Sequence, residues 1–370
     1  MKIAMLTTVH RHDDIRIYQK EARTLAAAGH RVYVVNPEYD GEDENGIRFV
    51  KIPAPKRRAG RILFGWRAAA RAAKELGAGC CHLHDPELLF AVPELRRAGM
   101  RVVYDAHEDL PRQILAKRWI WRPFRKAVSA LAERAEDHFA ARADAVIGAT
   151  ETIAARFPRS LAVRNLPDGE DAGRFAAAAR SSPCRRRAVC YAGALTEQRG
   201  LFRMIEACRL SNAALLLAGE FESEALRARA ERSPGWAEHV EYLGRLDRPG
   251  VARMYAEASA AFLLLDDTPA YRQSLPIKLF EYLMAGLPVV ATDFPLWRAL
   301  SEGGAARFVP AGNVSAAAAA LDEVLSNPDW KRRAREGAAA LSEKLSFDRE
   351  RDRLLALYES LAARAEIGAP

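Results

Sequence analysis

The feature that most constrains the fold is a regular alternation of short apolar runs with longer segments of helical periodicity. In the first half of the chain the apolar runs predict strands at Lys2–Leu6, Arg31–Val35, Cys80–Leu83, Arg101–Tyr104 and Asp144–Ile147. Between the first two, residues 17–28 repeat apolar side chains at helical spacing and stop at Gly29, a typical helix C-terminal signal. Strands that alternate with helices predict crossover units and a parallel sheet that is covered on both faces.

The pattern fails between Asn165 and Arg187 and then starts again. The later strands are predicted at Ala188–Ala192, Leu215–Ala218, Val240–Leu243, Ala261–Leu265 and Val289–Ala291. A length of 370 residues also suits two domains. We therefore expect an α/β protein with an N-terminal domain (1–168), a linker (169–187), a C-terminal domain (188–346) and a last helix (347–370) that packs back on the N-terminal domain. Two such halves predict a ligand cleft between them.

Composition excludes several classes of protein. With 49% hydrophobic and 28% charged residues, the chain is neither disordered nor fibrous. It contains no run of about 20 apolar residues and begins without a long apolar signal core, which favours a cytoplasmic protein. Five cysteines fit reduced thiols better than a disulfide framework. The glycine patterns of dinucleotide-binding enzymes and P-loop NTPases are absent, which argues against both classes.

The net positive charge of the chain comes entirely from its first half. Residues 1–168 contain 29 basic and 21 acidic side chains, whereas residues 169–370 contain 27 of each. An anionic substrate, a membrane surface or a nucleic acid would each explain the asymmetry. No zinc-finger, RNA-recognition or basic-zipper pattern accompanies the charge, so we expect no nucleic-acid partner.

Two stretches of this first half combine basic and aromatic residues. Arg112–Lys126 holds six basic residues with two tryptophans and a phenylalanine, and no acid occurs between Asp109 and Glu133. Lys56–Lys74 holds seven basic residues with Phe64 and Trp66. Basic and aromatic side chains together are typical of surfaces that bind anionic membranes. The alternatives are a solvated helix face with the aromatic rings in the core, and a surface for a soluble anionic acceptor.

The most specific motif is the segment from Gln273 to Thr292, which reads QSLPIKLFEYLMAGLPVVAT. A helix that starts near Pro276 places Lys278 and Glu281 on one face, because they are three residues apart. The N-terminus of such a helix suits a phosphate, and a carboxylate one turn further can accept hydrogen bonds from ribose hydroxyls. An ordinary amphipathic helix with a surface lysine and glutamate is the alternative.

Two further segments of the second half combine a strand with a glycine turn. In Tyr191–Gly200, Gly193 allows close approach of the backbone to a ligand, and Arg199 precedes a helix that begins near Leu201. A guanidinium there can meet a diphosphate together with the helix dipole, unless it is a solvated surface arginine. In the other segment, a strand leads into the turn Gly244-Arg245-Leu246.

Three predicted strands of the first half end in polar residues. His10 and Arg16 follow the first strand, where the alternative is that Asp13 or Asp14 caps a helix. On a later strand His82 and His84 share one face, and so do Asp105 and His107 on the next. We expect no metal there, because no second cluster of ligands follows. The segment Asp85–Glu87 reads as a helix N-cap, a proline at the first position and an acid favoured by the helix dipole.

The segment around Glu281 resembles the signature of retaining glycosyltransferase family 4, whose fold is GT-B, two Rossmann-like domains facing across a cleft. The resemblance covers nearly the whole chain and is closest to a subset that carries S-L-P-x-K-L-F-E-Y. It implies transfer of a sugar from a nucleoside-diphosphate donor, with UDP-sugars favoured, with retention of configuration and without a metal or other cofactor. This subset points to bacterial cell-surface polysaccharide assembly, with a glycan or lipid-linked acceptor bound by the N-terminal domain.

The resemblance also assigns roles to residues. His107 matches the strand-end histidine at the reaction centre, with Asp105 beside it, and Gln273 stands where the family has a glutamate that contacts the donor sugar. His10, Arg16 and His84 become candidates for substrate contact. The expected donor-binding residues are Gly193, Arg199, Gly244, Arg245, Leu246, Ser274, Leu275, Lys278 and Glu281, of which Glu281 matches the family's ribose-binding glutamate.

Two departures from the family pattern keep other functions open. Gln273 replaces the first glutamate, and Ala194 replaces the first basic residue of the phosphate-binding loop. A non-catalytic sugar-nucleotide-binding scaffold would tolerate both changes. A sugar-nucleotide epimerase with the same fold would bind the same donors but would need no acceptor.

Overall fold

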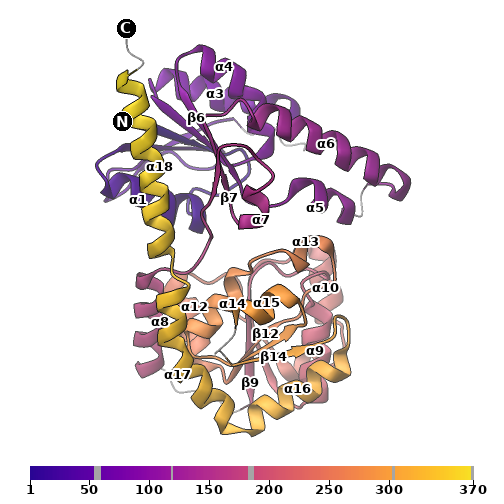
Figure 1. Cartoon of the computed structure of the whole chain (residues 1–370). Helices are drawn as coiled ribbons and strands as arrows, with labels where there is room; N and C mark the ends of the chain where they lie inside the picture. Colours follow the sequence, from indigo (N-terminus) through magenta and orange to yellow (C-terminus); the bar gives the residue numbers. More distant parts are fainter. Residues whose placement is uncertain (54–59, 118–119, 182–186, 302–304, 368–370) are drawn as a thin grey trace. The chain divides into compact units, whose positions relative to one another are not determined.

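The computed structural model describes residues 1–53, 60–117, 120–181, 187–301 and 305–367, and the chain divides into two compact units. The N-terminal unit combines Met1–Asn165 with Phe347–Pro370, and the C-terminal unit is Leu166–Ser346. In Figure 1 the colours follow this path, from indigo and magenta through orange to a yellow last helix. The chain therefore completes the C-terminal unit before it returns to the N-terminal one.

The N-terminal unit is built on one sheet of eight strands, in the order β3-β4-β2-β1-β5-β6-β7-β8. All neighbours are parallel except β3 and β4. The strands are β1 (Lys2–Leu6), β2 (Arg31–Asn36), β3 (Gly41–Glu42), β4 (Arg48–Lys51), β5 (Cys80–Leu83), β6 (Arg101–Ala106), β7 (Ala145–Gly148) and β8 (Ser160–Ala162). The buried strands match the predicted apolar runs, and the α/β fold with a parallel sheet is confirmed.

Helices connect these strands and cover the sheet (Figure 1). They are the π-helices η1 (Ile15–Ala22) and η2 (Arg61–Gly65), the 3₁₀ helices η3 (Pro86–Ala91) and η4 (Arg122–Phe124), and the α-helices α1 (Arg23–Ala27), α3 (Trp66–Glu75), α4 (Val92–Arg97), α5 (Leu110–Ala116), α6 (Arg125–Ala140), α7 (Glu151–Ala154) and α18 (Phe347–Ile367). Asp14 caps η1, because its carboxylate accepts hydrogen bonds from the backbone N–H groups of Arg16 and Ile17.

The register of the central strands brings three loops together. Leu6, the last residue of β1, lies opposite Val35 on one side and Leu83 on the other. Leu83 in turn lies opposite Tyr104 of β6. Because the strands are parallel, the loops after β1, β5 and β6 leave the sheet at the same edge, which is where ligands bind in this kind of sheet.

The C-terminal unit has a second sheet of six parallel strands, in the order β11-β10-β9-β12-β13-β14. The strands are β9 (Ala188–Ala192), β10 (Ala214–Ala218), β11 (Val240–Tyr242), β12 (Ala260–Leu263), β13 (Val289–Thr292) and β14 (Ala306–Val309). The helices are α8 (Gly169–Ser181), α9 (Leu201–Leu210), α10 (Glu224–Glu231), α11 (Trp236–His239), α12 (Arg248–Glu257), α13 (Pro269–Arg272), α14 (Ile277–Met284), α15 (Pro295–Leu300), α16 (Val314–Ser326) and α17 (Pro328–Lys344).

Two glycines let the loops of this unit pack tightly at the carboxyl edge of the sheet. A Cβ atom at Gly219 would lie 1.8 Å from the carbonyl oxygen of Gly193, and one at Gly200 would lie 2.1 Å from that of Leu264. Gly200 also has a φ of +84°, in the left-handed region that other residues rarely adopt. Side chains at these positions would push apart the loops that follow β9, β10 and β12.

The segment that we expected to be a linker, 169–187, is largely a helix. Helix α8 takes up Gly169–Ser181 and packs against α12 within the C-terminal unit, while residues 182–186 lie outside the described part of the chain. Asp168 caps this helix by accepting a hydrogen bond from the N–H of Asp171. Its alanines and glycines had suggested irregular structure, but alanine is also the best helix former.

The last helix, α18, belongs to the N-terminal unit and lies beside α1 and η1. Leu354, Tyr358 and Leu361 are its buried face. Near its start, the carboxylate of Glu350 accepts hydrogen bonds from the backbone N–H and the guanidinium of Arg164. No helix in the described part of the chain is long and apolar enough to cross a membrane.

Candidate active site

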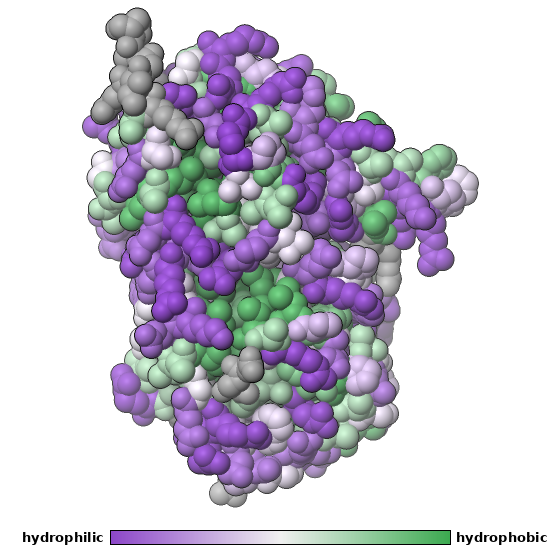
Figure 2. Space-filling model, viewed as in Figure 1, coloured by the Kyte–Doolittle hydropathy of each residue, from purple (hydrophilic) through white to green (hydrophobic). Residues whose placement is uncertain are grey.

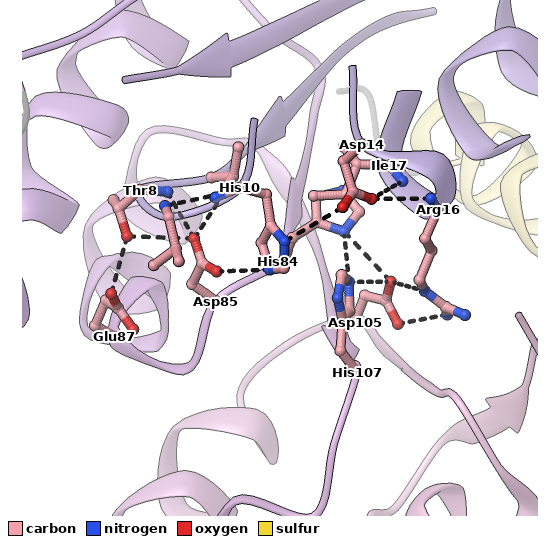
Figure 3. Close-up of polar contacts among 12 residues, drawn as sticks. Thr8, His10, Asp14, Arg16, Ile17, His84, Asp85, Glu87, Asp105 and His107 are labelled. Atoms are coloured by element: carbon pink, nitrogen blue, oxygen red, sulfur yellow. Dashed lines mark hydrogen bonds and ion pairs between the residues drawn. The ribbon is translucent and has the colours of Figure 1, made fainter. Parts of the chain in front are cut away.

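A dense polar cluster lies at the carboxyl edge of the N-terminal sheet. Its side chains come from the loop after β1 and from helix η1, from the end of β5 and from the end of β6, so the register of the sheet brings them together. Figure 3 draws the cluster and labels Thr8, His10, Asp14, Arg16, Ile17, His84, Asp85, Glu87, Asp105 and His107. The predicted residues His10, Arg16, His84, Asp105 and His107 all belong to it.

Arg16 and Asp105 form the buried centre of the cluster. The guanidinium donates from Nε to Oδ2 and from Nη2 to Oδ1 of Asp105, each at 2.7 Å, and from Nη1 to the carbonyl of Val163 at 2.8 Å. Burial alone would raise the pKa of Asp105, but Arg16 and His107 outweigh it and hold the pKa well below its usual range. The pair is therefore ionised and fixed in one geometry.

Glu21 lies beside this pair, where burial favours its protonated form. Its Oε1 is 3.1 Å from Nε of Arg16, but burial and the charge of Asp105 raise its pKa well above the usual value. One guanidinium faces two buried carboxyl groups, and Asp105 has the better geometry. A carboxylic acid in this position can donate a hydrogen bond instead of carrying a charge.

Glu21, His82, His84 and Asp105 also offer ligand atoms within 4.8 Å of one another, a spacing that a metal ion could use. The cation of Arg16 already occupies this cluster and takes both oxygens of Asp105. A metal would have to compete with a fixed guanidinium for the same carboxylates. The arrangement does not favour a metal site, and we propose none.

His84 and His107 contact the same oxygen of Asp105. Nδ1 of His84 lies 3.3 Å and Nε2 of His107 2.9 Å from Oδ2, and these two nitrogens are 3.2 Å apart. Burial lowers the pKa of His84 to about 4, so its ring is neutral at pH 7. Asp105 thereby orients His107, whose side chain is 17% exposed and the more accessible of the two histidines.

The outer part of the cluster is organised by Asp85. Its Oδ2 accepts hydrogen bonds from the N–H of Thr8 at 2.6 Å and from the hydroxyl of Thr7 at 2.9 Å. His10 bridges Asp85 and Asp14, at 3.3 and 3.5 Å. Burial would lower the pKa of His10, but these two carboxylates raise it to about 10, so the ring is a cation.

One sequence expectation for this region needs correction. Asp85 precedes η3 as predicted, but its side chain makes no capping hydrogen bond, because it is turned toward the loop after β1. Arg16, which we predicted to contact the substrate, is 3% exposed and contacts Asp105, Glu21 and the carbonyl of Val163. Asp105 is similarly buried. We therefore treat both as groups that position His107, which, with His10, is the exposed edge of the cluster.

In the C-terminal unit, Glu281 is the best-held carboxylate of the predicted donor site. It is fully buried on α14 and accepts hydrogen bonds from Nη1 of Arg248 at 2.8 Å, from Tyr255 at 2.7 Å and from Nζ of Lys278 at 2.7 Å. Burial would raise its pKa, but Lys278 and Arg248 lower it to about 2. Glu281 is thus an ionised acceptor at neutral pH, as a contact to ribose hydroxyls requires.

Arg199 precedes α9 as predicted and lies next to the glycine turn after β9. A Cβ at Gly193 would be 3.7 Å from Nη1 of Arg199. Burial would lower the pKa of the guanidinium, but hydrogen bonds and charge interactions with Tyr191 and Tyr271 raise it. The arginine is therefore a cation that the hydroxyls of Tyr191 and Tyr271 hold in place next to Gly193.

The remaining predicted donor residues lie in loops at the same edge. Gly244 has a φ of +66°, and its carbonyl accepts a hydrogen bond from the N–H of Gly219, while Arg245 is exposed and Leu246 partly buried. Gln273 follows α13 and is exposed. The backbone carbonyl of Ser274 accepts a hydrogen bond from the indole N–H of Trp297, which holds this loop in place. Leu275 is partly buried.

Several residues that shape these sites were not predicted. Each of them contacts a predicted site residue, either directly or through one intervening side chain: Glu21, Tyr358, Asp171, Arg248 and Tyr255. Only Glu21 carried a local signal, since it follows Arg16 by little more than one helical turn. Asp171 and Arg248 are 77 residues apart, so no short motif could have paired them.

Comparisons with known proteins agree with this architecture. Residues 16–165 match the model of Glycosyltransferase Family 4, and residues 186–327 match that of Glycosyl transferases group 1. The structure also superposes on Anabaena HepE in complex with UDP-glucose, with a TM-score of 0.72 at 14% identity, covering 97% of this chain and 100% of that one. Two parallel sheets of this kind are the GT-B fold. Both matching models describe glycosyltransferases and together they span most of the chain, so the chain is a glycosyltransferase whose N-terminal part matches family 4.

Two curated relatives carry the same name, phosphatidyl-myo-inositol mannosyltransferase. The protein of Mycobacterium leprae is 32% identical over 149 residues, which is 40% of this chain and only 38% of that protein. The protein of Mycolicibacterium smegmatis is 27% identical over 332 residues, 83% of this chain and 79% of that protein. The similarity therefore extends over most of the chain at a low level.

Proposed function

We propose that the protein transfers a hexosyl or N-acetylhexosaminyl group from a nucleoside-diphosphate sugar to a glycan or lipid-linked acceptor, with retention of configuration and without a metal. The observation that carries the proposal is Glu281, a buried carboxylate that remains ionised on α14, the helix whose Tyr282 contacts the end of β9 just before the loop with Arg199. An ionised acceptor for ribose hydroxyls and a cation at a glycine turn are what a nucleoside diphosphate needs. The complex of HepE with UDP-glucose makes UDP-sugars the favoured donors.

In this mechanism the departing diphosphate is stabilised electrostatically. The bond between the anomeric carbon of the donor sugar and the diphosphate oxygen breaks, and the acceptor oxygen, losing its proton, bonds to the same carbon. Negative charge grows on the departing diphosphate, and fixed cations lower the energy of that state. Arg199 and Lys278 are the side chains that we assign to this task. His107, oriented by Asp105, is assigned to the donor sugar, and His10 to the surroundings of the acceptor. The buried His84 contacts Asp105 and so supports the orientation of His107.

The experiment measures thermal stabilisation by UDP, GDP and ADP, followed by transfer assays. Binding to the folded state raises the melting temperature by an amount that grows with the logarithm of the ratio of ligand concentration to Kd. UDP-glucose, UDP-N-acetylglucosamine and GDP-mannose, the last chosen because of the curated relatives, are then incubated with and without a phosphatidylinositol acceptor. Acceptor-dependent product supports the proposal, conversion of the donor alone indicates an epimerase, and stabilisation without any turnover indicates a scaffold.

We further propose that the acceptor is carried by an anionic membrane, with the enzyme on its cytoplasmic face. Around η4 and the start of α6, Trp121 is 71%, Phe124 55% and Leu131 68% exposed, among basic residues. Figure 2 shows hydrophobic and hydrophilic side chains next to one another at this projecting end of the N-terminal unit. Such a mixture suits an interface of acyl chains and charged headgroups.

The second basic stretch adds a similar surface. Of Lys56–Lys74, residues 56–59 lie outside the described part of the chain, as do Arg118 and Trp119 of Arg112–Lys126. Leu63 and Phe64 of η2 are 59% and 54% exposed. Co-sedimentation with phosphatidylglycerol vesicles tests the proposal. The double variant Trp121→Ser, Phe124→Ser should bind them more weakly, and equal binding of both proteins would contradict it.

A further inference from the structure

The three hydrogen-bond donors around Glu281 leave its carboxylate little capacity for a ligand. A carboxylate has about four acceptor positions, two on each oxygen. Oε1 takes Arg248, and Oε2 takes both Tyr255 and Lys278. One position therefore remains, on Oε1, whereas the two neighbouring hydroxyls of a ribose need two. A ribose can bind Glu281 through both hydroxyls only if one of the three donors leaves.

The three donors differ in how firmly they are held. The hydroxyl of Tyr255 belongs to a ring that is 1% exposed in the core. Arg248 is clamped from its other side by Asp171, at 3.1 Å from Nε and 2.5 Å from Nη2. Lys278 has one hydrogen-bond partner among the described residues, Glu281 itself, and its side chain is 18% exposed. Lys278 is thus the donor that can leave at least cost.

The place of Lys278 on α14 indicates where its ammonium can go. One turn further along the helix, the hydroxyl of Tyr282 accepts a hydrogen bond from the N–H of Ala192, the last residue of β9. A helix that connects parallel strands runs against them, so Lys278 lies toward the carboxyl edge, where the loop with Gly193 and Ala194 begins. That loop carries Arg199 but has an alanine where a second cation would serve a diphosphate.

We propose that Lys278 exchanges partners when a nucleoside diphosphate binds: the ribose hydroxyls replace its ammonium on Glu281, and the ammonium moves to the diphosphate of the same ligand. This inference rests on the proposed function and adds a ligand-dependent step to it. While no ribose is bound, the ammonium of Lys278 neutralises the carboxylate of Glu281. When the ligand binds, the ammonium contacts the diphosphate, which the side chain of Ala194 cannot do. The ligand class is a nucleoside diphosphate with an intact 2′,3′-diol.

The exchange predicts effects of opposite sign for two ligands. In Lys278→Met the diphosphate loses a charged contact, so UDP should bind about ten- to a hundredfold more weakly. Uridine has the diol but no phosphate, so it gains nothing from the released ammonium and must still displace it. Uridine should therefore bind Lys278→Met severalfold more tightly than the wild type. If Lys278 only held Glu281 in place, both ligands would bind the variant more weakly.

The test is a pair of titrations by NMR chemical-shift perturbation, with UDP and with uridine, on the wild type, Lys278→Met and the control Lys344→Met. Lys344 is an exposed lysine at the end of α17 in the same unit. Lys278→Gln is measured in parallel, so that poor folding of one variant does not decide the result. Weaker UDP binding with tighter uridine binding, in the Lys278 variants alone, is the expected result.

The remaining outcomes separate this inference from the proposed function. If the wild type binds UDP but the Lys278 variants lose affinity for both ligands, or for neither, the exchange is wrong and the proposed donor site stands. If GDP or ADP stabilises the wild type in place of UDP, that nucleotide and its nucleoside are the probes. If the wild type binds none of the three, the proposed donor site fails and the exchange fails with it.

Discussion

The hydroxyl of Tyr358 on α18 lies 2.9 Å from Nδ1 of His82 on β5, and both residues are fully buried. Burial lowers the pKa of His82 well below its usual value, so the ring is neutral. Tyr358 is the hydrogen-bond partner of Nδ1, while Nε2 faces Glu21 at 3.9 Å. The last helix thereby supplies the partner of a buried histidine at the back of the polar cluster.

Removal of this hydroxyl should destabilise the protein. In Tyr358→Phe, Nδ1 of His82 stays buried without its partner, so we expect the free energy of unfolding to fall by about 1–3 kcal/mol. Urea denaturation measures it. Tyr39→Phe, on a ring that is 40% exposed, serves as the control and should change stability by less than about 0.5 kcal/mol. Equal effects of the two substitutions would contradict the role of the contact.

The ion pair between Arg164 and Glu350 should contribute more to the free energy of unfolding than an exposed ion pair does. Glu350 is fully buried and receives two hydrogen bonds from the guanidinium, at 2.9 and 2.6 Å. Arg164→Met leaves that carboxylate without its main partner, and we expect a loss of about 3 kcal/mol in denaturation experiments. Arg164→Met with Glu350→Met should lose less than the sum of the single changes. Simple additivity would show that the two side chains do not interact.

His10 should make stability depend on pH in the alkaline range. Because its pKa in the folded protein is raised to about 10, the folded state holds a proton that the unfolded chain releases near pH 6.5. The stabilisation is therefore complete below about pH 6.5 and is lost as pH rises toward 10. Between pH 6.5 and pH 9.5, the free energy of unfolding should decrease more for the wild type than for His10→Asn. Identical slopes would refute the charged histidine.

Arg16 should not be replaceable by lysine. An ammonium cannot make two parallel hydrogen bonds to Asp105 and also reach the carbonyl of Val163. We expect Arg16→Lys to lower the free energy of unfolding by about 2–4 kcal/mol, as measured by denaturation. Arg31→Lys is an exposed control at the start of β2 and should have little effect. Tolerance of Arg16→Lys would mean that charge alone suffices.

Kinetic measurements can separate the role proposed for His107 in sugar transfer from the role proposed for Arg199 in nucleotide binding. His107→Ala should lower kcat for transfer while nucleotide affinity stays near that of the wild type, because the ring is assigned to the sugar. Arg199→Ala should instead raise the Kd for UDP about ten- to a hundredfold, because a charged phosphate contact is lost. His138→Ala, on the exposed side of α6, is the control. Unchanged transfer in both site variants would refute the assignment.

The central strands could be predicted because buried parallel strands are continuous apolar runs. Lys2–Leu6 and Cys80–Leu83 are of this kind, and polar residues after them mark the edge of the sheet. Four strands were missed. Gly41–Glu42 (β3) and Ser160–Ala162 (β8) are too short or too exposed to form such a run, and Arg48–Lys51 (β4) and Ala306–Val309 (β14) are partly exposed and interrupted by charged residues. Helix α8 was missed because Gly169 and Gly173 precede its run of alanines.

In the candidate sites, motifs predicted which residues meet but not how accessible they are. Lys278 and Glu281 share a helix face, and their contact at 2.7 Å follows from a spacing of three. The burial of Arg16 depends on Asp105, 89 residues away, and on the carbonyl of Val163. Contacts at such separations are set by the topology of the sheet, which a local pattern does not contain.

The return of the chain to the N-terminal unit has a consequence for biosynthesis. Ribosomes deliver residues 1–165 long before helix α18, and the whole C-terminal unit emerges in between. Until residues 347–367 appear, His82 lacks Tyr358 and Arg164 lacks Glu350. The C-terminal unit, being continuous in sequence, can fold first during translation. Until α18 emerges, the residues of the N-terminal unit that Leu354, Tyr358 and Leu361 cover stay uncovered, and in this period a nascent chain would most need a chaperone.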